Sequence, residues 1–208
     1  VAYKETFDGE VEAEGKYIRQ SGGRGQFGHC WLRVESKERG SGNEFVDAIK
    51  GGAIPGEFIK AVGKGVMETL DNGLLLGYPV IDVKVTCYDG SYHEVDSSEM
   101  AFKIAASQAL QAASRKGNMG LLEPVMKVEV TTPSEFMGDI IGDLSSKRAQ
   151  ISGTEERGNA TIILALVPLE ELSGYATQVR SMSQGRANFY MEPAHYEIVP
   201  KNIVDQMG

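Results

Sequence analysis

The 208-residue chain contains little cysteine, little positive charge and no long apolar segment. Its two cysteines, Cys30 and Cys87, have apolar or aromatic neighbours, which favours free thiols in a reducing compartment over a disulfide. No run of about 18 apolar residues occurs, so the sequence predicts no membrane-spanning helix. No signal peptide is recognisable, and because the chain opens with Val1 rather than Met we expect a fragment of a longer protein.

The formal net charge of −8 argues against a protein that coats a polyanion non-specifically. It leaves open a large RNA partner held at a few discrete points, because each phosphate neutralised by Lys or Arg contributes through counterion release. One stretch departs from the acidic average, since residues 16–33 contain no carboxylate. Their basic side chains are Lys16, Arg19, Arg24, Arg33 and His29.

The centre of this stretch, residues 21–29, is rich in glycine. Four glycines surround Arg24, Gln26 and Phe27. Glycine lets a backbone approach a partner closely, Arg and Gln supply hydrogen-bond donors, and Phe supplies a stacking face. The pattern predicts a flexible cationic tip that touches nucleic acid locally. The alternative is a mobile hairpin without a partner, and residue chemistry alone does not separate the two.

Two nucleotide-binding motifs are incomplete in this chain. Residues 23–28 satisfy G-x-G-x-x-G, but a dinucleotide fold needs a helix next, and Cys30–Val34 has the composition of a strand. A kinase loop does lie between strands, yet no H-R-D or D-F-G follows. The P-loop pattern fails because Phe58 replaces its first glycine and Gly65 replaces the Ser or Thr that holds magnesium. We therefore expect no catalytic residue and no nucleotide site here.

Other polar candidates also have ordinary interpretations. His93 precedes a predicted helix, where it is either a solvent-exposed histidine or a general base without an assignable nucleophile. A zinc site made of His29, Cys30, Cys87 and His93 has suitable residue types but lacks paired ligand spacing, so we expect no metal. The segment Arg157–Asn159 is a weak candidate for the phosphate loop of an acylphosphatase-like enzyme.

The alternation of strands and helices predicts an α+β protein with two domains that divide near Gly120. The acidic start, with Glu5 its first carboxylate, is interpreted as a solvated face, and residues 36–43 as a polar loop. The first domain is predicted to contain strands at 16–20, 30–35 and 80–88, a helix from Pro55 to Asn72 and a turn at Asp89-Gly90. The segment Asp96–Glu99 resembles a capping box, which opens a predicted helix from Ser98 to Lys116.

The second domain has the order β-α-β-β-α-β, which predicts a ferredoxin-like fold. Its strands are predicted at 123–131, 150–155, 160–167 and 187–196. Its helices follow Pro133 and Pro168, two residues that suit the first turn of a helix. A tail from Pro200 to Met207 is expected to form one or two helical turns.

Long segments of the chain resemble elongation factor G, the translocase of bacterial-type ribosomes. Its fourth domain is matched by IRQSGGRGQFGH (residues 18–29), YPVIDVKV (78–85) and DGSYHEVDSSEMAFK (89–103). Its fifth domain is matched by LEP (122–124), MGDIIGDL (137–144), GYAT (174–177) and RS (180–181). The departures are mild, since Ala149 and Ala187 stand where the family usually has glycine.

The resemblance implies a fold for each part. Residues 1–120 would have the fold of a ribosomal protein's second domain, a β-α-β arrangement with a left-handed crossover. Residues 121–197 would be ferredoxin-like, and a final helix at 198–208 would pack back on the fourth domain. GTP and magnesium would bind in an N-terminal GTPase domain that this chain lacks, so this part would be no enzyme.

The resemblance also implies a function and partners. The protein would promote GTP-dependent translocation of tRNA and mRNA on the ribosome, as a monomer without a membrane partner. It would act in the bacterial cytoplasm, with a mitochondrion or the plastid stroma as alternatives. A paralogue specialised for ribosome recycling and a resistance-type ribosome protector are alternatives within the family.

The residues implied to meet RNA fall into two groups. The fourth-domain tip would enter the decoding region of the small subunit, and its residues are Ser21, Gly22, Gly23, Arg24, Gly25, Gln26 and His93. We expect His93 to lie near the glycine loop in space. Four bases are candidates for contact with large-subunit ribosomal RNA near the stalk base, or are ordinary surface charge: Lys147, Arg148, Arg157 and Arg186.

Overall fold

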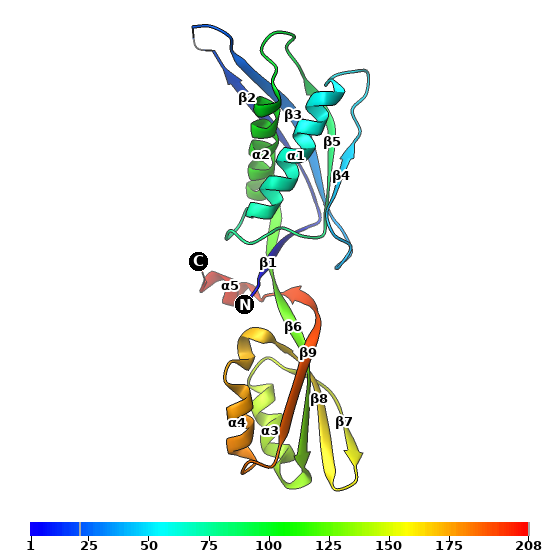
Figure 1. The fold of residues 1–208 in the computed structure, drawn as a ribbon, viewed down its shortest axis with the longest axis vertical. Coiled ribbons are helices and arrows are strands. Elements are labelled where there is room, and N and C mark those ends of the chain that lie inside the picture. Colours follow the sequence, from blue (N-terminus) through cyan, green and yellow to red (C-terminus); the bar gives the residue numbers. More distant parts are fainter. Residues whose placement is uncertain (21, 208) are drawn as a thin grey trace. The chain divides into compact units, whose positions relative to one another are not determined.

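The computed structural model describes residues 1–20 and 22–207, which fold into two compact units. The N-terminal unit comprises Tyr3–Leu122 together with the residues from Val199 onward. The C-terminal unit comprises Glu123–Ile198 together with Val1 and Ala2. Both units contain sheets and separate helices, which confirms the predicted α+β class (Figure 1).

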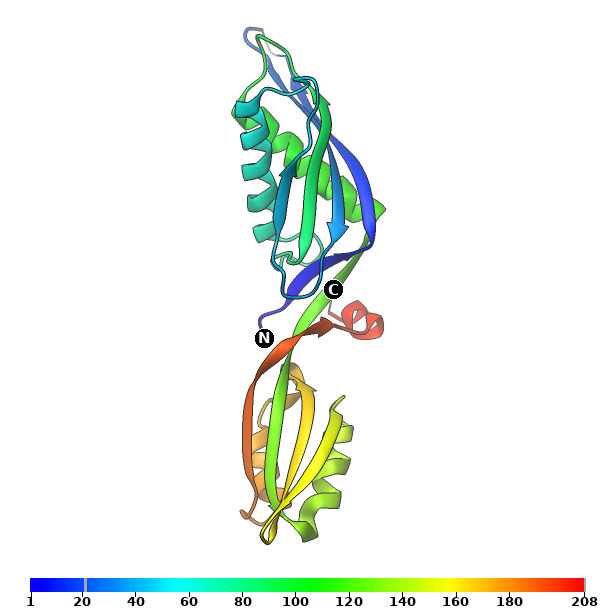
Figure 2. The same cartoon turned by 90° about the vertical axis from the view of Figure 1, so that its right-hand side faces the viewer.

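The N-terminal unit is built on a four-stranded sheet with two helices on one face (Figure 2). The strands, in spatial order, are β2 (Glu10–Arg19), β3 (Gln26–Ser36), β5 (Val83–Ser91) and β4 (Glu44–Asp47). The helices are α1 (Gly56–Asn72) and α2 (Glu99–Lys116). Strands β4 and β5 are parallel and are connected through α1, which is a crossover connection. That this crossover is left-handed stays a prediction.

A further strand pair lies outside this sheet. Strand β1 (Lys4–Asp8) pairs antiparallel with Asn118–Leu122, the first residues of β6 (Asn118–Pro133). The backbone N–H of Val199 donates to the carbonyl of Leu121 at 2.8 Å, and α5 (Lys201–Asp205) follows. The predicted helical tail is therefore present and is grouped with the N-terminal unit.

The C-terminal unit has the ferredoxin-like order that its sequence predicts. Its elements, in chain order, are the rest of β6, α3 (Met137–Ser145), β7 (Gln150–Arg157), β8 (Ala160–Pro168), α4 (Tyr175–Met182) and β9 (Asn188–Ile198), with short 3-10 turns before both helices. The spatial order is β7-β8-β6-β9. Ile140 and Leu144 of α3 and Val179 of α4 are buried against the strands, as their helical spacing predicts.

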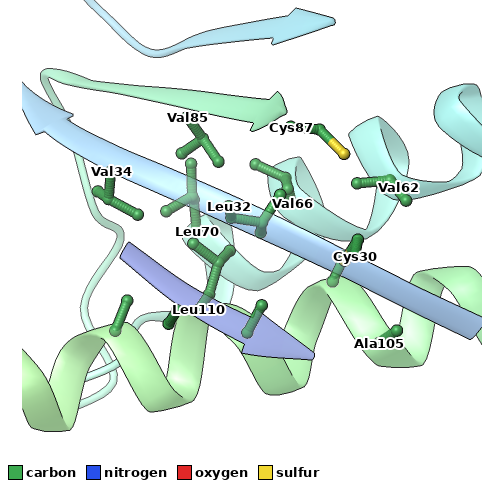
Figure 3. Packing of buried hydrophobic residues seen from close by; sticks show 14 of the residues in the cluster. Cys30, Leu32, Val34, Val62, Val66, Leu70, Val85, Cys87, Ala105 and Leu110 are labelled. Atoms are coloured by element: carbon green, nitrogen blue, oxygen red, sulfur yellow. The ribbon is translucent and has the colours of Figure 1, made fainter. Parts of the chain in front are cut away.

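The core of the N-terminal unit lies between the sheet and the two helices (Figure 3). Alternate residues of β3, namely Cys30, Leu32 and Val34, are fully buried, as period-two patterning requires. They pack with apolar residues of both helices and of β5: Val62, Val66, Leu70, Val85, Cys87, Ala105 and Leu110. Both cysteines are free, as predicted, and burial raises the pKa of each thiol, that of Cys87 to about 12.

The predicted turn at Asp89-Gly90 is wrong, because both residues continue strand β5. Asp89 pairs with Trp31 and Gly90 with Cys30, after a β-bulge that shifts the register between Trp31 and Leu32. A Cβ atom on Gly90 would lie 2.4 Å from the carbonyl oxygen of His29. The glycine therefore serves close packing between strands rather than reversal of the chain.

The interpretation of the acidic start as a solvated face is wrong for Glu5, although Glu10, Glu12 and Glu14 are exposed. Glu5 is fully buried, and its carboxylate accepts four backbone N–H groups at 2.6–3.1 Å. The donors belong to Leu74, Leu75, Leu76 and Tyr78, in the segment that follows α1. Glu5 therefore supplies the hydrogen-bond acceptors that a helix or strand would otherwise supply to this segment.

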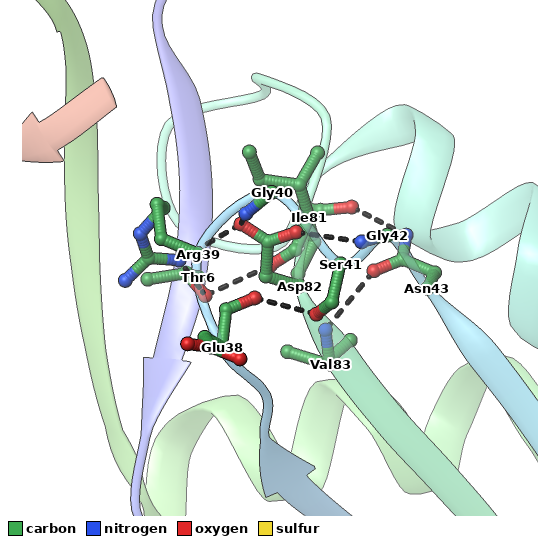
Figure 4. Close-up of polar contacts among 11 residues, drawn as sticks. Thr6, Glu38, Arg39, Gly40, Ser41, Gly42, Asn43, Ile81, Asp82 and Val83 are labelled. Atoms are coloured by element: carbon green, nitrogen blue, oxygen red, sulfur yellow. Dashed lines mark hydrogen bonds and ion pairs between the residues drawn. The ribbon is translucent and has the colours of Figure 1, made fainter. Parts of the chain in front are cut away.

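A second buried carboxylate organises the loop between β3 and β4 (Figure 4). Asp82 has a positive φ of 60°. Its oxygens accept the N–H of Gly40 at 3.0 Å, that of Gly42 at 2.9 Å, and the Arg39 guanidinium at 3.1 Å. Asn43 completes the attachment, because its amide donates to the Val80 carbonyl and accepts from the Val83 N–H.

These bonds predict a pH-dependent stability for the N-terminal unit. Burial alone raises the pKa of Asp82, but the N–H groups of Gly40 and Gly42 and the Arg39 guanidinium outweigh it and hold the pKa below its ordinary value of 3.8. A carboxyl whose pKa is lower in the folded state adds stability above pH 3.8, and this contribution is lost as the pH falls through the folded pKa.

We therefore expect the free energy of unfolding to fall as the pH drops below about 4, and to fall less steeply in Asp82→Asn. Urea titrations at several pH values, followed by the fluorescence of the single tryptophan, Trp31, measure this difference. The same acid profile in both proteins would contradict the assignment to Asp82.

Candidate nucleic-acid interface

Two loops far apart in the sequence lie side by side at one end of the N-terminal unit (Figure 1). One loop connects β2 to β3 and the other connects β5 to α2. The Arg24 guanidinium Nε donates to the Val95 carbonyl at 3.1 Å, although 71 residues separate them. The backbone N–H of Phe27 donates to the Asp96 carbonyl at 2.9 Å. We call residues 20, 22–27 and 92–98 the tip; the predicted contact residue Ser21 lies outside the described residues.

The structure places His93 beside the glycine loop, as predicted. Its ring centre is 6.2 Å from that of Phe27, and 54% of its side chain is exposed. Its Nδ1 atom accepts the backbone N–H groups of Val95 at 3.3 Å and Asp96 at 3.2 Å. In the neutral ring the proton must then be on Nε2, so the exposed edge of His93 presents a donor.

Gln26 is also oriented by the protein. Its Oε1 atom accepts the Ser98 hydroxyl at 2.8 Å. The same hydroxyl oxygen accepts the Ala101 N–H at 3.1 Å, which makes Ser98 the N-cap of α2. Because the Gln26 amide oxygen can only accept, the Ser98 hydroxyl proton is directed at Gln26. The Gln26 amide nitrogen has no partner among residues 1–20 and 22–207 and can donate outward.

The glycines of the loop differ in exposure. Gly22 and Gly23 are exposed, and Gly22 has a φ of 46°. Gly25 is buried, and a Cβ on it would lie 2.7 Å from the Arg19 carbonyl oxygen and 3.0 Å from the Asp96 carboxylate. Gly25 therefore serves the packing of the tip, whereas Gly22, Gly23 and Arg24 form its exposed backbone and charge.

The charge of the tip is more mixed than residues 16–33 alone predict. Arg24 is exposed, and the Arg19 guanidinium, just outside the tip, lies 4.5 Å from the centre of the Tyr17 ring. The second loop adds Glu94 and Asp96, which were not considered as tip residues from sequence. The sequence reasoning missed them because they follow the glycine loop by some 70 positions and no local pattern connects them.

The bases of the C-terminal unit separate into two groups. Arg157 and Arg186 line one groove of about 310 Å³, together with Asn159 and Asn188. Both arginines have carboxylate neighbours, since Arg186 lies 2.7 Å from Glu135, and Arg157 lies 3.4 Å from Glu155. The Arg186 side chain remains 55% exposed and the Arg157 side chain 73% exposed. Lys147 and Arg148 do not line this groove.

Arg148 is committed to contacts within the unit. Its guanidinium donates to both oxygens of the buried Glu123 at 2.7 and 3.0 Å, and its Nε donates to Glu171 at 3.0 Å. The bonds to Glu123 and then to Glu171 raise the pKa of Arg148 above its ordinary value. Lys147 lies 4.0 Å from Asp143 and 5.9 Å from the centre of the Tyr175 ring. These contacts indicate that Arg148 stabilises the fold.

The residues weighed for a zinc site are used in other ways. His29 lies in β3, where its Nε2 is 2.6 Å from Glu14 and its Nδ1 is 2.7 Å from Ser91. In the part of the chain that the structure describes, no group of three or more His, Cys, Asp or Glu residues could hold a metal ion. Over the same residues, no helix combines the length and apolar character that crossing a membrane requires.

Comparison with known proteins identifies the family. The family model described as elongation factor G, domain IV, matches residues 1–118, and that of the elongation factor G C-terminus matches residues 120–207. The chain belongs to the elongation factor G family. A crystal structure of a protein from Thermus thermophilus matches all of this chain with a TM-score of 0.87 and 38% identity. The chain spans 31% of the length of that protein.

The match confirms the resemblance of the sequence to the fourth and fifth domains of elongation factor G. It assigns no role to single residues of the tip. Gln20 and Asp96 were missed as tip residues by sequence reasoning. In the capping box that Asp96–Glu99 resembles, Asp96 would be the N-cap, but in the structure Ser98 caps α2 and Asp96 bonds the other loop.

Proposed function

We propose that the tip of this elongation factor G chain contacts RNA in the decoding region of the small ribosomal subunit. The observation that supports this is the convergence of three outward hydrogen-bond donors at one end of the unit. They are the Gln26 amide, the Nε2–H of His93 and the guanidinium of Arg24. Two loops that contribute nothing to the core are held together there by their own hydrogen bonds.

A set of donors suits a partner that offers acceptors. The shallow minor groove of A-form RNA presents 2′-hydroxyl oxygens, base acceptors and adjacent phosphates. Contacts of this kind depend on the shape and backbone of the RNA and hardly on base identity. The tip would therefore hold paired codon and anticodon of any sequence, as translocation requires.

The chemistry of GTP would belong to other parts of the longer protein. In this proposal the GTPase domain and its magnesium ion supply the energy, and the present chain supplies binding surfaces for the ribosome, tRNA and mRNA. The factor would act as a monomer. In the C-terminal unit, the groove with Arg157, Asn159, Arg186 and Asn188 is the best candidate for phosphates of large-subunit ribosomal RNA, because two exposed guanidinium groups share it.

The proposal predicts a separation of two activities in the full-length factor. The double variant Gln26→Ala/His93→Ala should slow tRNA movement on the ribosome by on the order of tenfold, because it removes two donors at the contact. Ribosome-dependent GTP turnover should stay within about twofold of the parent. Rapid mixing with fluorescent tRNA or mRNA measures the first rate, and phosphate release measures the second.

The matched control is Gln111→Ala/His195→Ala, which removes the same residue types from exposed positions on α2 and β9. It should leave both rates unchanged. Equal loss of movement and GTP turnover in the tip variant, or equal slowing in the control, would contradict the proposal. A ribosome-splitting assay on the same proteins distinguishes translocation from the recycling alternative.

A further inference from the structure

The Asp96 side chain bonds the two loops of the tip to each other through both of its oxygens, in addition to the Arg24–Val95 and Ser98–Gln26 bonds. Its Oδ1 accepts the backbone N–H of Gly25 at 3.2 Å, and its Oδ2 accepts the side-chain amide of Gln20 at 3.0 Å. Its backbone carbonyl accepts the N–H of Phe27, and its own N–H donates to His93. Only 12% of the Asp96 side chain is exposed, so solvent competes weakly for these bonds.

The surrounding residues fit closely around this carboxylate. A Cβ atom on Gly25 would lie 3.0 Å from Asp96 Oδ2 and 3.0 Å from Gln20 Nε2, so only glycine fits there without displacement. The loop that carries Asp96 is closed by the buried Ser97, whose hydroxyl accepts the His93 N–H at 2.8 Å and whose N–H donates to the His93 carbonyl. Asp96 is thus fixed on one side and holds the glycine loop on the other.

We propose that Asp96 is a positioning residue for RNA contact. It holds Gln26 and His93 at one fixed separation, although they belong to loops that the chain connects only through the body of the unit. This inference rests on the proposed function of the tip. In it, Asp96 acts through Gln26 and His93 and does not itself contact RNA. Without the carboxylate, the glycine loop would lose two of the bonds that hold it to the second loop, and a smaller fraction of molecules would be competent to bind RNA.

Two substitutions at Asp96 test the chemistry of the bonds. Asp96→Ala removes both acceptors and should slow tRNA movement by the full-length factor about tenfold, with GTP turnover unchanged. Asp96→Asn keeps one acceptor for the Gly25 N–H, and its amide can donate to Gln20 once the Gln20 amide rotates. It should therefore retain movement within about threefold of the parent. Asp71→Ala, which removes an exposed carboxylate from α1 outside the tip, is the control and should have no effect.

A coupling experiment distinguishes positioning from direct contact or from general stability. If Asp96 acts only through Gln26 and His93, Asp96→Ala should add little to the slowing already caused by Gln26→Ala/His93→Ala. Amide hydrogen exchange in the 208-residue chain should show faster exchange at Gly25 and Phe27 in Asp96→Ala, with unchanged protection at Leu32 in the middle of β3. Full additivity, or a general loss of protection with a lowered unfolding temperature, would overturn the positioning role.

The outcomes separate the two proposals. Slow movement in Gln26→Ala/His93→Ala with parental speed in Asp96→Ala overturns the role of Asp96 and leaves the proposed function intact. Parental speed in both overturns the proposed function. Should Asp96→Ala fail to fold, Gln20→Ala removes one of the two bonds from an exposed residue and should slow movement about threefold. Parental speed in Gln20→Ala would then overturn the proposal.

Discussion

Replacing Gly15 with alanine is expected to destabilise the N-terminal unit strongly. Gly15 lies in the middle of β2, beneath helix α2. A Cβ atom there would lie 1.8 Å from the carbonyl oxygen of Ala105 and 2.9 Å from the backbone nitrogen of Ala109. These are backbone atoms of a helix and cannot rotate away, so the helix and the sheet would have to separate. The same holds for Gly28 on β3, where a Cβ would be 2.3 Å from the Ala101 carbonyl.

Overpacking of a core costs about 1–3 kcal/mol when side chains can adjust. Here only backbone can move, so we expect a loss above about 3 kcal/mol, which lowers the thermal midpoint by roughly 10 °C or more. Circular dichroism with Trp31 fluorescence measures this, since the single tryptophan belongs to this unit. Gly56→Ala is the matched control, because apart from adjacent residues and the backbone of its own helix no atom lies within 4 Å of its Cβ position. A midpoint for Gly15→Ala within about 2 °C of the parent would contradict the packing argument.

The second large effect is expected at Glu5. In Glu5→Ala, four backbone N–H groups of residues 74–78 lose their acceptor, and the short segment has no other secondary structure to satisfy them. Hydrogen bonds to a charged group contribute about 1.5–3 kcal/mol each. Some of these donors can reach water after rearrangement, so we expect a total loss of about 4 kcal/mol rather than the full sum.

Urea denaturation measures the change in the free energy of unfolding. Glu5→Gln should lose a large part of the same stability, because its amide group places a donor opposite backbone donors. Glu10→Ala is the control: it removes an exposed carboxylate that pairs with Arg33 at 3.2 Å, and should change stability by less than about 0.5 kcal/mol. Equal losses in the free energy of unfolding for Glu5→Ala and Glu10→Ala would show that the buried hydrogen bonds of Glu5 do not stabilise the unit.

Much of the fold follows from local patterns. The spacing of Ile59, Val62, Val66 and Leu70 predicts the buried face of α1, and the resemblance of residues 96–99 to a capping box predicts where α2 begins. The short strands β1 and β4 were missed because each has only four or five residues and carries charged side chains. The Asp89-Gly90 pair is typical of a turn, and only the approach of His29 and Ile54 explains a glycine within a strand.

The sequence predicts which residues belong to the candidate site, but it does not predict the hydrogen bonds that orient them. The composition of residues 16–33 and the resemblance to elongation factor G led to Gln26 and His93. The bonds that orient these two side chains come from Ser98, Val95 and Asp96, and span up to 72 residues. Such bonds depend on tertiary structure. The same holds for Arg148, which as a surface base suggested RNA and in the structure donates to Glu123 and Glu171.

The burial of both sulfur atoms has a practical consequence. Cys30 and Cys87 belong to the N-terminal unit, neither has any exposed surface, and the environment disfavours the thiolate that alkylating reagents require. The C-terminal unit contains no cysteine. Alkylation of the native chain therefore reports unfolding of the N-terminal unit only. The rate of alkylation measures the rate of that unfolding without any engineered label.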